Sequence, residues 1–336
     1  APPAAVVDAR HRGPDGARVD GVPTFRTLGA ALEAAPANAA APHVIHLRDG
    51  RYREKLSVTK PNVWLVGESR DGTVLTWDAA AGHPRPDGSG PYTTRGSYTL
   101  RVAAPGFRLR SMTVENGFDH PANAARAADD PARVEGAQAV ALLLETGSDR
   151  AALTDCRLVG WQDTLFADAG RAYFGGCEIL GHVDFIFGAA QAVFEDCDIV
   201  SRDRGDPANN GYVAAPSTRR SHPYGFLFVR SRLRREHPGL APGSVALGRP
   251  WRPGGNRRAV GSAVFVDVWM DDHVSARGWE PMGGYPPEEA RLFEHGSTGP
   301  GAVASPSRRV LTDAEAAYYT PAQVLRGWDP RAEDPR

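Results

Sequence analysis

The sequence predicts an all-β fold, a parallel β-helix built as one elongated domain over residues 1–336. Three cysteines recur at intervals of 21 and 20 residues, at Cys156, Cys177 and Cys197. Each lies in a short run that alternates apolar and polar residues and is bounded by Gly, Asp, Asn or Pro, which is typical of strands and turns. A unit of about 20 residues with short strands and no helix buries a core only by stacking, so the repeat predicts a solenoid.

Runs in the same register, although weaker, occur at residues 109–114, 228–233 and 265–270. A leucine-rich repeat has a similar period, but it would show a regular frame of Leu and Asn that this sequence lacks. A β-sandwich would show hairpin signals and no stacked register. The parallel β-helix is therefore the interpretation that accounts for the spacing.

The two ends of the sequence predict helices. Near the N-terminus, apolar residues recur at helical spacing over residues 28–35 and stop at Pro36, so we expect a helix that covers the open end of the solenoid. Near the C-terminus, residues 312–315 and 320–323 each form a capping box. These boxes predict two short helices packed along the side, the second ended by Gly327.

Four segments rich in Gly, Pro, Asn, Arg and Asp predict long loops between coils: 79–97, 116–136, 202–224 and 234–257. Loops on a rigid scaffold commonly carry binding and catalytic groups. We therefore expect an open cleft along one face of the solenoid, with walls built by these loops.

Composition argues against several classes of partner. The net charge is −1 and charged residues are 24% of the chain, so no global field favours nucleic acid or an anionic membrane. No run approaches the ~20 apolar residues that a membrane span needs. The chain begins at Ala1 without Met, which suggests a mature or trimmed protein, with removal of a signal peptide as one explanation. We expect a secreted or periplasmic location. We also expect a monomer.

The cysteines do not indicate a metal site. They lack the CxxC spacing of structural zinc, and no cofactor motif or other clear ligand cluster occurs. An odd number of cysteines allows at most one internal disulfide. Cys177 and Cys197 fit either stacked core thiols or a disulfide in a secreted protein, whereas Cys156 fits a buried core position.

Two aspartates share the period of the repeat. Asp163 and Asp184 are also 21 residues apart, and each follows its cysteine by seven residues among bulky, mostly uncharged neighbours. Because coils stack about 4.8 Å apart, the two carboxylates should repel by about 3 kcal/mol at ~5 Å and an effective dielectric of ~20. Such a pair holds one carboxyl protonated while the other ionises, which supplies an acid and a nucleophile or base. The alternative is that both aspartates only cap turns at strand ends.

Five motifs in the chain resemble those of the pectin methylesterases (pectinesterases), and they occur in that family's order. They are GRYRE at 50–54, QAVAL at 138–142, GWQDTLF at 160–166, GHVDFIFG at 181–188 and LGRPW at 247–251. The likeness runs from about residue 6 to 328 and favours the bacterial branch. It implies a right-handed parallel β-helix that removes methyl esters from the galacturonate units of pectin and releases methanol, with no metal or cofactor.

The resemblance also implies a role for each matching residue. Asp184 matches the nucleophile, and Asp163 matches the general acid that later acts as base. Gln162 matches the main oxyanion donor, Gln138 a second polar group at the same place, and Arg249 the arginine that binds the nucleophile. The positions that line the sugar cleft in the family match Trp251, Phe166, Val183, Phe187 and Met282.

Other interpretations of these residues remain open. Arg249 fits a surface ion pair, Trp251 fits core packing, and Gln138 fits a group that satisfies turn backbone. Two positions depart from the family, since Trp161 stands where Tyr is frequent and His182 where a small or hydroxyl residue is common.

Rival functions are an acyl-thioesterase of the same superfamily, a β-helical pectin lyase or polygalacturonase, and a non-catalytic polysaccharide-binding solenoid. The sequence lacks the acidic clusters that a calcium-dependent lyase needs and the clustered aspartates of a polygalacturonase. It also lacks the GxSxG elbow of a serine esterase. The thioesterase and the binding solenoid are therefore the alternatives that the sequence leaves open.

Overall fold

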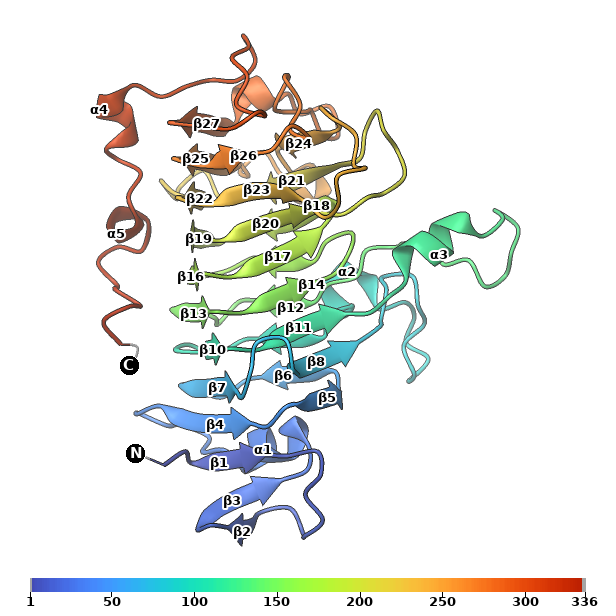
Figure 1. Cartoon of the computed structure of the whole chain (residues 1–336), viewed down its shortest axis with the longest axis vertical. Coiled ribbons are helices and arrows are strands. Elements are labelled where there is room, and N and C mark those ends of the chain that lie inside the picture. The colour runs from blue at the N-terminus through green and yellow to red at the C-terminus, as the bar shows by residue number, and fades with distance from the viewer. Residues whose placement is uncertain (1, 334–336) are drawn as a thin grey trace.

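Each full coil gives one strand to each of three long sheets that run side by side along the molecule (Figure 1). The computed structural model describes residues 2–333. Among these residues the strands of the three sheets pair in parallel from coil to coil, and an antiparallel pair, β2–β3, lies at the N-terminal end. The predicted parallel β-helix is therefore confirmed.

The first sheet has twelve strands, in spatial order β2 (Ala17–Val19), β3 (Val22–Phe25), β1 (Ala5–Val7), β4 (His43–Leu47), β7 (Val63–Gly67), β10 (Arg108–Arg110), β13 (Ala151–Thr154), β16 (Arg171–Gly175), β19 (Gln191–Glu195), β22 (Phe226–Val229), β25 (Ser262–Val266) and β27 (Arg291–His295). The second has eight, β26 (Trp269–Met270), β23 (Arg232–Arg235), β20 (Asp198–Ser201), β17 (Glu178–Gly181), β14 (Arg157–Val159), β11 (Thr113–Asn116), β8 (Thr73–Trp77) and β5 (Gly50–Arg53). The third has seven, β24 (Val245–Gly248), β21 (Gly211–Pro216), β18 (Val183–Gly188), β15 (Leu165–Ala167), β12 (Leu142–Leu144), β9 (Leu100–Val102) and β6 (Leu56–Val58).

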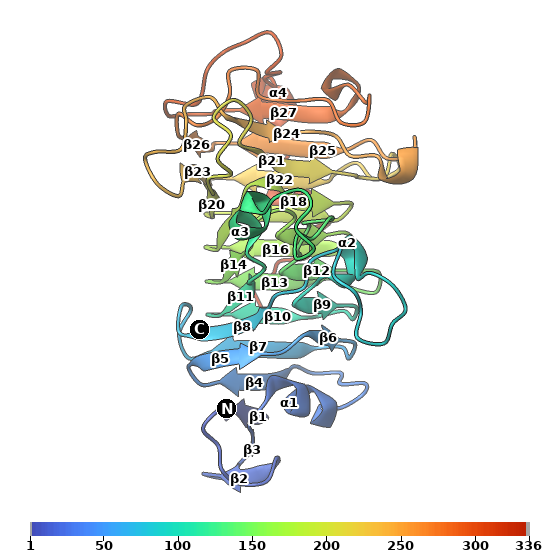
Figure 2. The same ribbon diagram turned by 90° about the vertical axis from the view of Figure 1, so that its right-hand side faces the viewer.

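Short helices lie outside the sheets: α1 (Leu28–Ala34), α2 (Thr93–Gly96), α3 (His120–Ala125), the 3₁₀ turns η1 (Pro253–Gly255) and η2 (Pro287–Glu289), α4 (Asp313–Ala316) and α5 (Pro321–Val324). Figure 2 shows α2 and α3 in front of the strands, on the side from which loops project. These loops leave the second sheet and enter the third, so they stand beside the starts of the third sheet's strands.

Columns of side chains, one coil apart, fill the space between the sheets. The register pairs Arg157 with Glu178 and Glu178 with Asp198, so the three preceding cysteines belong to one column. All three are buried free thiols, which favours the core-thiol interpretation over a disulfide. A second column stacks four phenyl rings with successive centroid distances of 4.7, 4.6 and 4.4 Å: Phe174, Phe194, Phe228 and Phe265.

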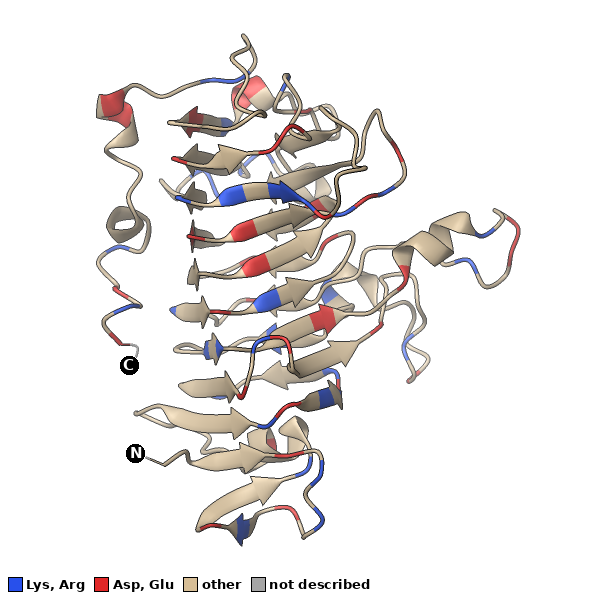
Figure 3. Cartoon of the chain, in the orientation of Figure 1, with Lys and Arg blue, Asp and Glu red and all other residues tan. Residues whose placement is uncertain are grey.

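Charged residues of both signs lie on successive strands of the second sheet (Figure 3). Arg157 donates to Glu178 on the next strand at 2.9 Å, and Arg232 donates to Asp198 at 2.6 Å. Opposite charges on neighbouring strands stabilise the pairing modestly and keep this face in water. The stack is therefore apolar inside and ionic outside.

Helix α1 forms where the sequence predicts it. The Thr27 side chain accepts from the Ala30 N–H as N-cap, and three apolar residues of α1 are buried against the first coils. Glu54, from the GRYRE motif, accepts from the N–H groups of Leu28 at 3.0 Å and Gly29 at 2.9 Å. Its carboxylate thus satisfies backbone donors that the helix start leaves free. The GRYRE motif thus holds α1 against the N-terminal end of the solenoid.

The C-terminal segment runs back along the outer face of the first sheet (Figure 1). Both predicted capping boxes are present, at Thr312 in α4 and at Thr320 in α5, and Gly327 adopts a positive φ of 81° after α5. Apolar residues of this segment cover apolar residues that the sheet presents outward: Leu311, Val324, Leu325 and Trp328 against Ala152, Tyr173, Val193 and Leu227.

Two of the four predicted loops were wrong in extent. The segment 202–224 contains strand β21, and 234–257 contains the last residues of β23 and all of β24. Both β21 and β24 are short apolar runs flanked by Gly, Pro and Asn, so composition averaged over twenty residues hid them. The true loops, 202–210, 217–225, 236–244 and 249–261, are separated by these strands of the third sheet.

Candidate active site

The two aspartates lie in matching positions of adjacent coils, at the starts of strands in the third sheet. Leu165 pairs with Ile186 and Phe166 with Phe187, which preserves the 21-residue offset. The Asp163 N–H donates to the Val183 carbonyl at 3.0 Å, just before Asp184. The stacking that the repeat predicts is therefore present.

The backbone at Asp184 departs from regular strand geometry. Pairing of β18 with β21 shifts between Val183 and Ile186, which is a β-bulge that contains Asp184. Asp163 and Asp184 have positive φ values of 63° and 50°. Bulges and left-handed residues re-aim side chains, and they cluster at functional sites. The chain thus uses local distortion to direct both carboxylates.

Arg249 holds Asp184 through two parallel hydrogen bonds. Its Nε donates to Oδ1 at 2.8 Å and its Nη2 donates to Oδ2 at 2.7 Å. The guanidinium also lies over the Tyr212 ring, 4.0 Å from its centroid. A two-pronged pair of this kind fixes the carboxylate plane and favours its ionised form. The surface ion-pair interpretation fails because Asp184 is only 6% exposed.

The environment separates the two carboxyls chemically. Burial, followed by the charge of Asp184, raises the pKa of Asp163 well above its usual range. Burial also raises the pKa of Asp184, but the hydrogen bonds and charge of Arg249 oppose that rise. Asp184 is therefore the member that ionises first, and Asp163 is the member that keeps its proton.

Aromatic side chains adjoin the aspartates on the outer side of the third sheet. The rings of Phe166 and Phe187 stack at 4.2 Å, and Trp251 lies 6.0 and 5.7 Å from them. Both phenylalanines are buried, whereas Trp251 is partly exposed. The phenylalanines thus form a floor beneath Trp251, and Val183, next to Asp184, is also buried.

Met282 lies farther along the chain, in a turn closed by Met282 and Tyr285. The Tyr285 ring packs under the guanidinium of Arg252, 3.4 Å from the ring centroid. Met282 is thus connected to the site through Tyr285 and Arg252, the residue that follows Trp251. Among the predicted cleft residues, Met282 has the least direct support.

The two glutamines come from adjacent coils beside the aspartates. The Ala139 N–H donates to the Gln162 carbonyl at 3.1 Å, which places Gln138 and Gln162 at neighbouring levels. Both side chains are half-buried. Amide N–H donors in such positions add polarity without adding charge, which suits stabilisation of a developing oxyanion.

A family model of pectinesterases matches residues 17–328. Pectinesterase A of Dickeya chrysanthemi is 42% identical over 327 residues, which cover 91% of this chain and 88% of the relative. The chain belongs to the pectinesterase family.

Solved pectinesterase structures agree with this assignment. Pectin methylesterase PemA from Erwinia chrysanthemi superposes with a TM-score of 0.92 at 40% identity, covering 98% of this chain and 99% of that one. The pectin methylesterase from carrot gives a TM-score of 0.75 at 30% identity, covering 100% and 97%. A third structure, of pectin methylesterase in complex with hexasaccharide VII, gives 0.91 at 40% identity, covering 98% and 99%.

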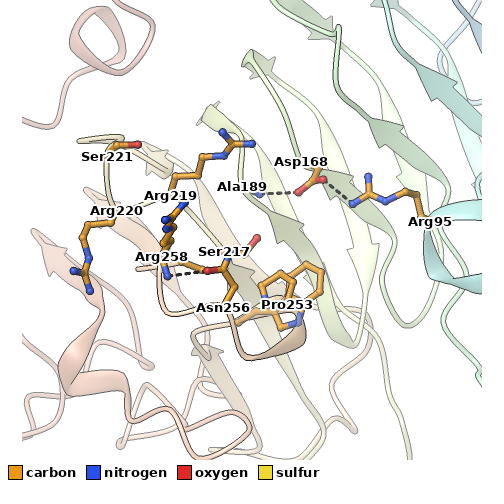
Figure 4. Close-up of a pocket in the computed structure, with 12 residues that line it drawn as sticks. Arg95, Asp168, Ala189, Ser217, Arg219, Arg220, Ser221, Pro253, Asn256 and Arg258 are labelled. Atoms are coloured by element: carbon orange, nitrogen blue, oxygen red, sulfur yellow. Dashed lines mark hydrogen bonds and ion pairs between the residues drawn. The ribbon is translucent and has the colours of Figure 1, made fainter.

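This pectinesterase has a cavity of about 860 Å³ at the far ends of the third sheet's strands (Figure 4). Residues that directly follow β15, β18 and β21 line it, namely Asp168, Ala189 and Ser217, and so does Trp251. Arg249 and Trp251 are two residues apart, so one short segment joins the aspartate pair to the cavity. Neither aspartate lines the cavity, which therefore adjoins the pair through this segment.

A histidine pair in this pectinesterase had no signal in the sequence. His182 lies 3.3 Å from His120, ring nitrogen to ring nitrogen, and the Val183 N–H donates to His182 Nδ1 at 2.8 Å. Burial lowers the pKa of His182 to about 2, so its ring is neutral. The side chain of Gln162 interacts with His120 and opposes the lowering of the pKa of His120 by burial. His120 is the first residue of helix α3, 62 residues earlier, which sequence spacing does not indicate.

Within residues 2–333, no group of three or more His, Cys, Asp or Glu side chains is arranged to hold a metal ion. In the same residues, no helix is both long and apolar enough to cross a membrane.

Proposed function

We propose that this chain is a pectin methylesterase that hydrolyses the C6 methyl esters of galacturonate units, with Asp184 as nucleophile and Asp163 as acid and base. The observation that carries this proposal is the buried carboxyl pair, of which one member is held by Arg249 and the other is not. Family membership supports the reaction, and the asymmetry of the pair supports the roles.

In the first step, the ionised Asp184 oxygen attacks the ester carbonyl carbon and forms a covalent bond. The carbonyl oxygen becomes an oxyanion, to which the amide groups of Gln162 and Gln138 donate. When the intermediate collapses, the bond to the methoxy oxygen breaks and Asp163 gives its proton to that oxygen. Methanol leaves, and an anhydride joins Asp184 to the sugar carboxyl.

In the second step, Asp163 is ionised because it has lost its proton. It removes a proton from water, whose oxygen attacks the anhydride at the sugar carbonyl. The bond to the Asp184 oxygen breaks, which releases the galacturonate carboxyl. Both aspartates then have the protonation states with which they began.

We infer that the substrate is methyl-esterified pectin bound along the open cleft past Trp251. The structure of a related pectin methylesterase in complex with a hexasaccharide supports an oligosaccharide-sized site. We further infer a single-domain monomer that acts outside the cytoplasm, where pectin occurs, without nucleic acid or membrane partners.

Substrate comparison tests the proposed reaction against its rivals. The expected result is methanol release from methyl-esterified pectin, with no ultraviolet-absorbing unsaturated product and no new reducing ends. Cleavage of an acyl thioester in preference to pectin would instead support the thioesterase. Sugar binding without turnover would support a non-catalytic solenoid.

A further inference from the structure

We propose that His182 and His120 form a hydrogen-bond relay that orients the side-chain amide of Gln162, so that its NH₂ group faces the oxyanion formed during the reaction. Both histidines are positioning residues, because they act through Gln162 and do not touch the reacting atoms. This inference rests on the proposed function, since it assigns a support to the oxyanion donor of the same site. The evidence comes from hydrogen-bond distances, the direction in which each group donates, and the packing around the pair.

The relay begins at a backbone group beside the nucleophile. The Val183 N–H donates to Nδ1 of His182 at 2.8 Å, so this nitrogen carries a lone pair and no proton. The proton of the neutral His182 ring is therefore on Nε2, which lies 3.3 Å from Nδ1 of His120. His182 thus donates to His120, and His120 accepts through Nδ1.

The same reasoning places the proton of His120. Because Nδ1 accepts, the proton of the neutral ring is on Nε2. The side chain of Gln162 also hydrogen-bonds to this ring. A ring N–H requires an oxygen as its acceptor, so Oε1 of Gln162 faces His120 and the NH₂ group is left for the oxyanion. Without this contact, a half-turn of the amide would place its oxygen against the oxyanion and repel it.

Both rings favour the neutral form that the relay requires. Burial lowers the pKa of His182 to about 2, and the neighbouring His120 and the charges of Arg204 and Arg202 act in the same direction. Burial lowers the pKa of His120 as well, against the opposing charge of Asp119. A protonated ring would carry an N–H on both nitrogens, which would set two donors against each other. Neutral rings are thus the state in which every link has one donor and one acceptor.

The His182 ring has a fixed position in the stack. Its backbone N–H donates to the Trp161 carbonyl at 3.0 Å, and its carbonyl accepts from the Tyr212 N–H at 3.0 Å. The ring contacts those of His120 and Trp161, with centroid distances of 4.4 and 5.6 Å, and the Arg202 guanidinium lies 3.5 Å from the Trp161 ring centroid. Trp161 and His182 are the two positions that depart from the family pattern. Because they contact each other, the two departures form one structural unit.

Helix α3 holds His120 at its first position, in front of the stacked strands (Figure 2). Asp119 caps the helix by accepting from the Ala122 N–H at 3.0 Å. The Asn123 side chain exchanges two hydrogen bonds with the backbone of Val134, at 3.1 and 2.8 Å, and so closes the segment that carries α3. His120 therefore reaches the relay from a closed, capped segment, which limits the entropy lost in orienting its ring.

The first test is a double-mutant cycle on kcat for methanol release from methyl-esterified pectin. His120→Phe keeps an aromatic ring but removes the donor to Gln162. Its kcat should fall about tenfold at unchanged KM, because the oxyanion exists only after the attack. His120→Gln keeps an N–H donor of similar reach and should stay within about threefold of wild type. In a Gln162→Ala background, His120→Phe should cause no further loss.

Equal losses from His120→Phe in both backgrounds, or no loss in either, would overturn the proposal. The matched control is His295→Phe, since His295 also hydrogen-bonds through Nε2, to Asp313 at 2.8 Å, but on the last strand of the first sheet. This control should remain within about twofold of wild type. A tenfold loss in the control as well would overturn the assignment of the effect to the relay. If His120→Phe does not fold, His120→Ala takes its place, because His120 is only half-buried.

The second test is nitrogen NMR of the imidazole rings in histidine-labelled wild type near neutral pH. We expect both His182 and His120 in the form protonated on Nε2 alone. A proton on Nδ1 of either ring would overturn the relay. If wild type releases no methanol, the proposed function fails, and the protonation of the two rings alone decides whether the relay exists.

Discussion

Removal of Arg249 should both slow the enzyme and change its pH dependence. Arg249 makes two charge-assisted hydrogen bonds to Asp184, at 2.8 and 2.7 Å, and Asp184 is buried. Breaking a buried pair from one side costs about 3–5 kcal/mol, because the remaining charge has no partner. This cost destabilises the ionised form of Asp184, which is the form that attacks the ester. In Arg249→Ala, kcat/KM near neutral pH should therefore drop by roughly 10²- to 10⁴-fold.

The direction of the pH change follows from the pKa of Asp184. Arg249 opposes the rise that burial causes, so its loss raises that pKa further. Since the attacking form is the ionised one, the acidic limb of kcat/KM against pH should move to higher pH in Arg249→Ala. Arg249→Lys, which keeps the charge but loses the two-pronged geometry, should fall between the variant and wild type.

The assay is methanol release across pH, with Arg232→Ala as a matched control. Arg232 also pairs with two carboxylates, at 2.6 and 2.9 Å, but on the outer face of the second sheet. Surface pairs contribute about 0–1 kcal/mol, so the control should remain within about twofold of wild type. An Arg249→Ala enzyme within tenfold of wild type, with an unshifted acidic limb, would refute the role of Arg249.

Three further predictions concern stability. The pKa of Asp163 is raised in the folded protein, so its contribution to stability is lost as pH rises from the unfolded value through the folded value. Asp163→Asn should therefore raise Tm at pH 7 and raise it less at pH 4; equal Tm changes would contradict this. Phe194→Ala removes a ring from the middle of the phenyl column and should lower the free energy of unfolding in urea by about 3–5 kcal/mol. Phe293 is partly exposed, so Phe293→Ala should lower it by less. The three cysteines are free, so a reductant should leave Tm unchanged, whereas a drop would indicate a disulfide.

The sequence contains enough information to predict the stack because the solenoid repeats its register. A 21-residue interval shared by cysteines and aspartates becomes a separation of one coil, so Asp163 and Asp184 meet without any knowledge of the loops. The terminal helices were also predictable, because capping residues such as Thr27 and Thr320 bind backbone N–H groups only three residues away in the sequence. Arg249 is different, because 65 residues separate it from Asp184 and only the family resemblance connected them.

Features that depend on loop geometry could not be predicted. The bulge at Asp184 is an extra residue in β18 relative to its partner β21, and β21 itself lies within a segment that composition predicts as a loop. His120 reaches His182 from helix α3, which lies between two coils in a segment without repeat register. Arg219 and Arg258 line one cavity because two loops pair through Arg219 and Ala259, forty residues apart in the chain. Contacts between irregular segments leave no periodic trace in a sequence.

The most direct test of the central claim is the rate of methanol release from methyl-esterified pectin by wild type, Asp184→Asn and Asp163→Asn. Asparagine keeps the size of each side chain but removes the nucleophile or the proton donor. We expect rapid release by wild type and a loss of about 10³-fold or more in Asp184→Asn, with a large loss also in Asp163→Asn. Release by Asp184→Asn within tenfold of wild type would contradict the covalent mechanism.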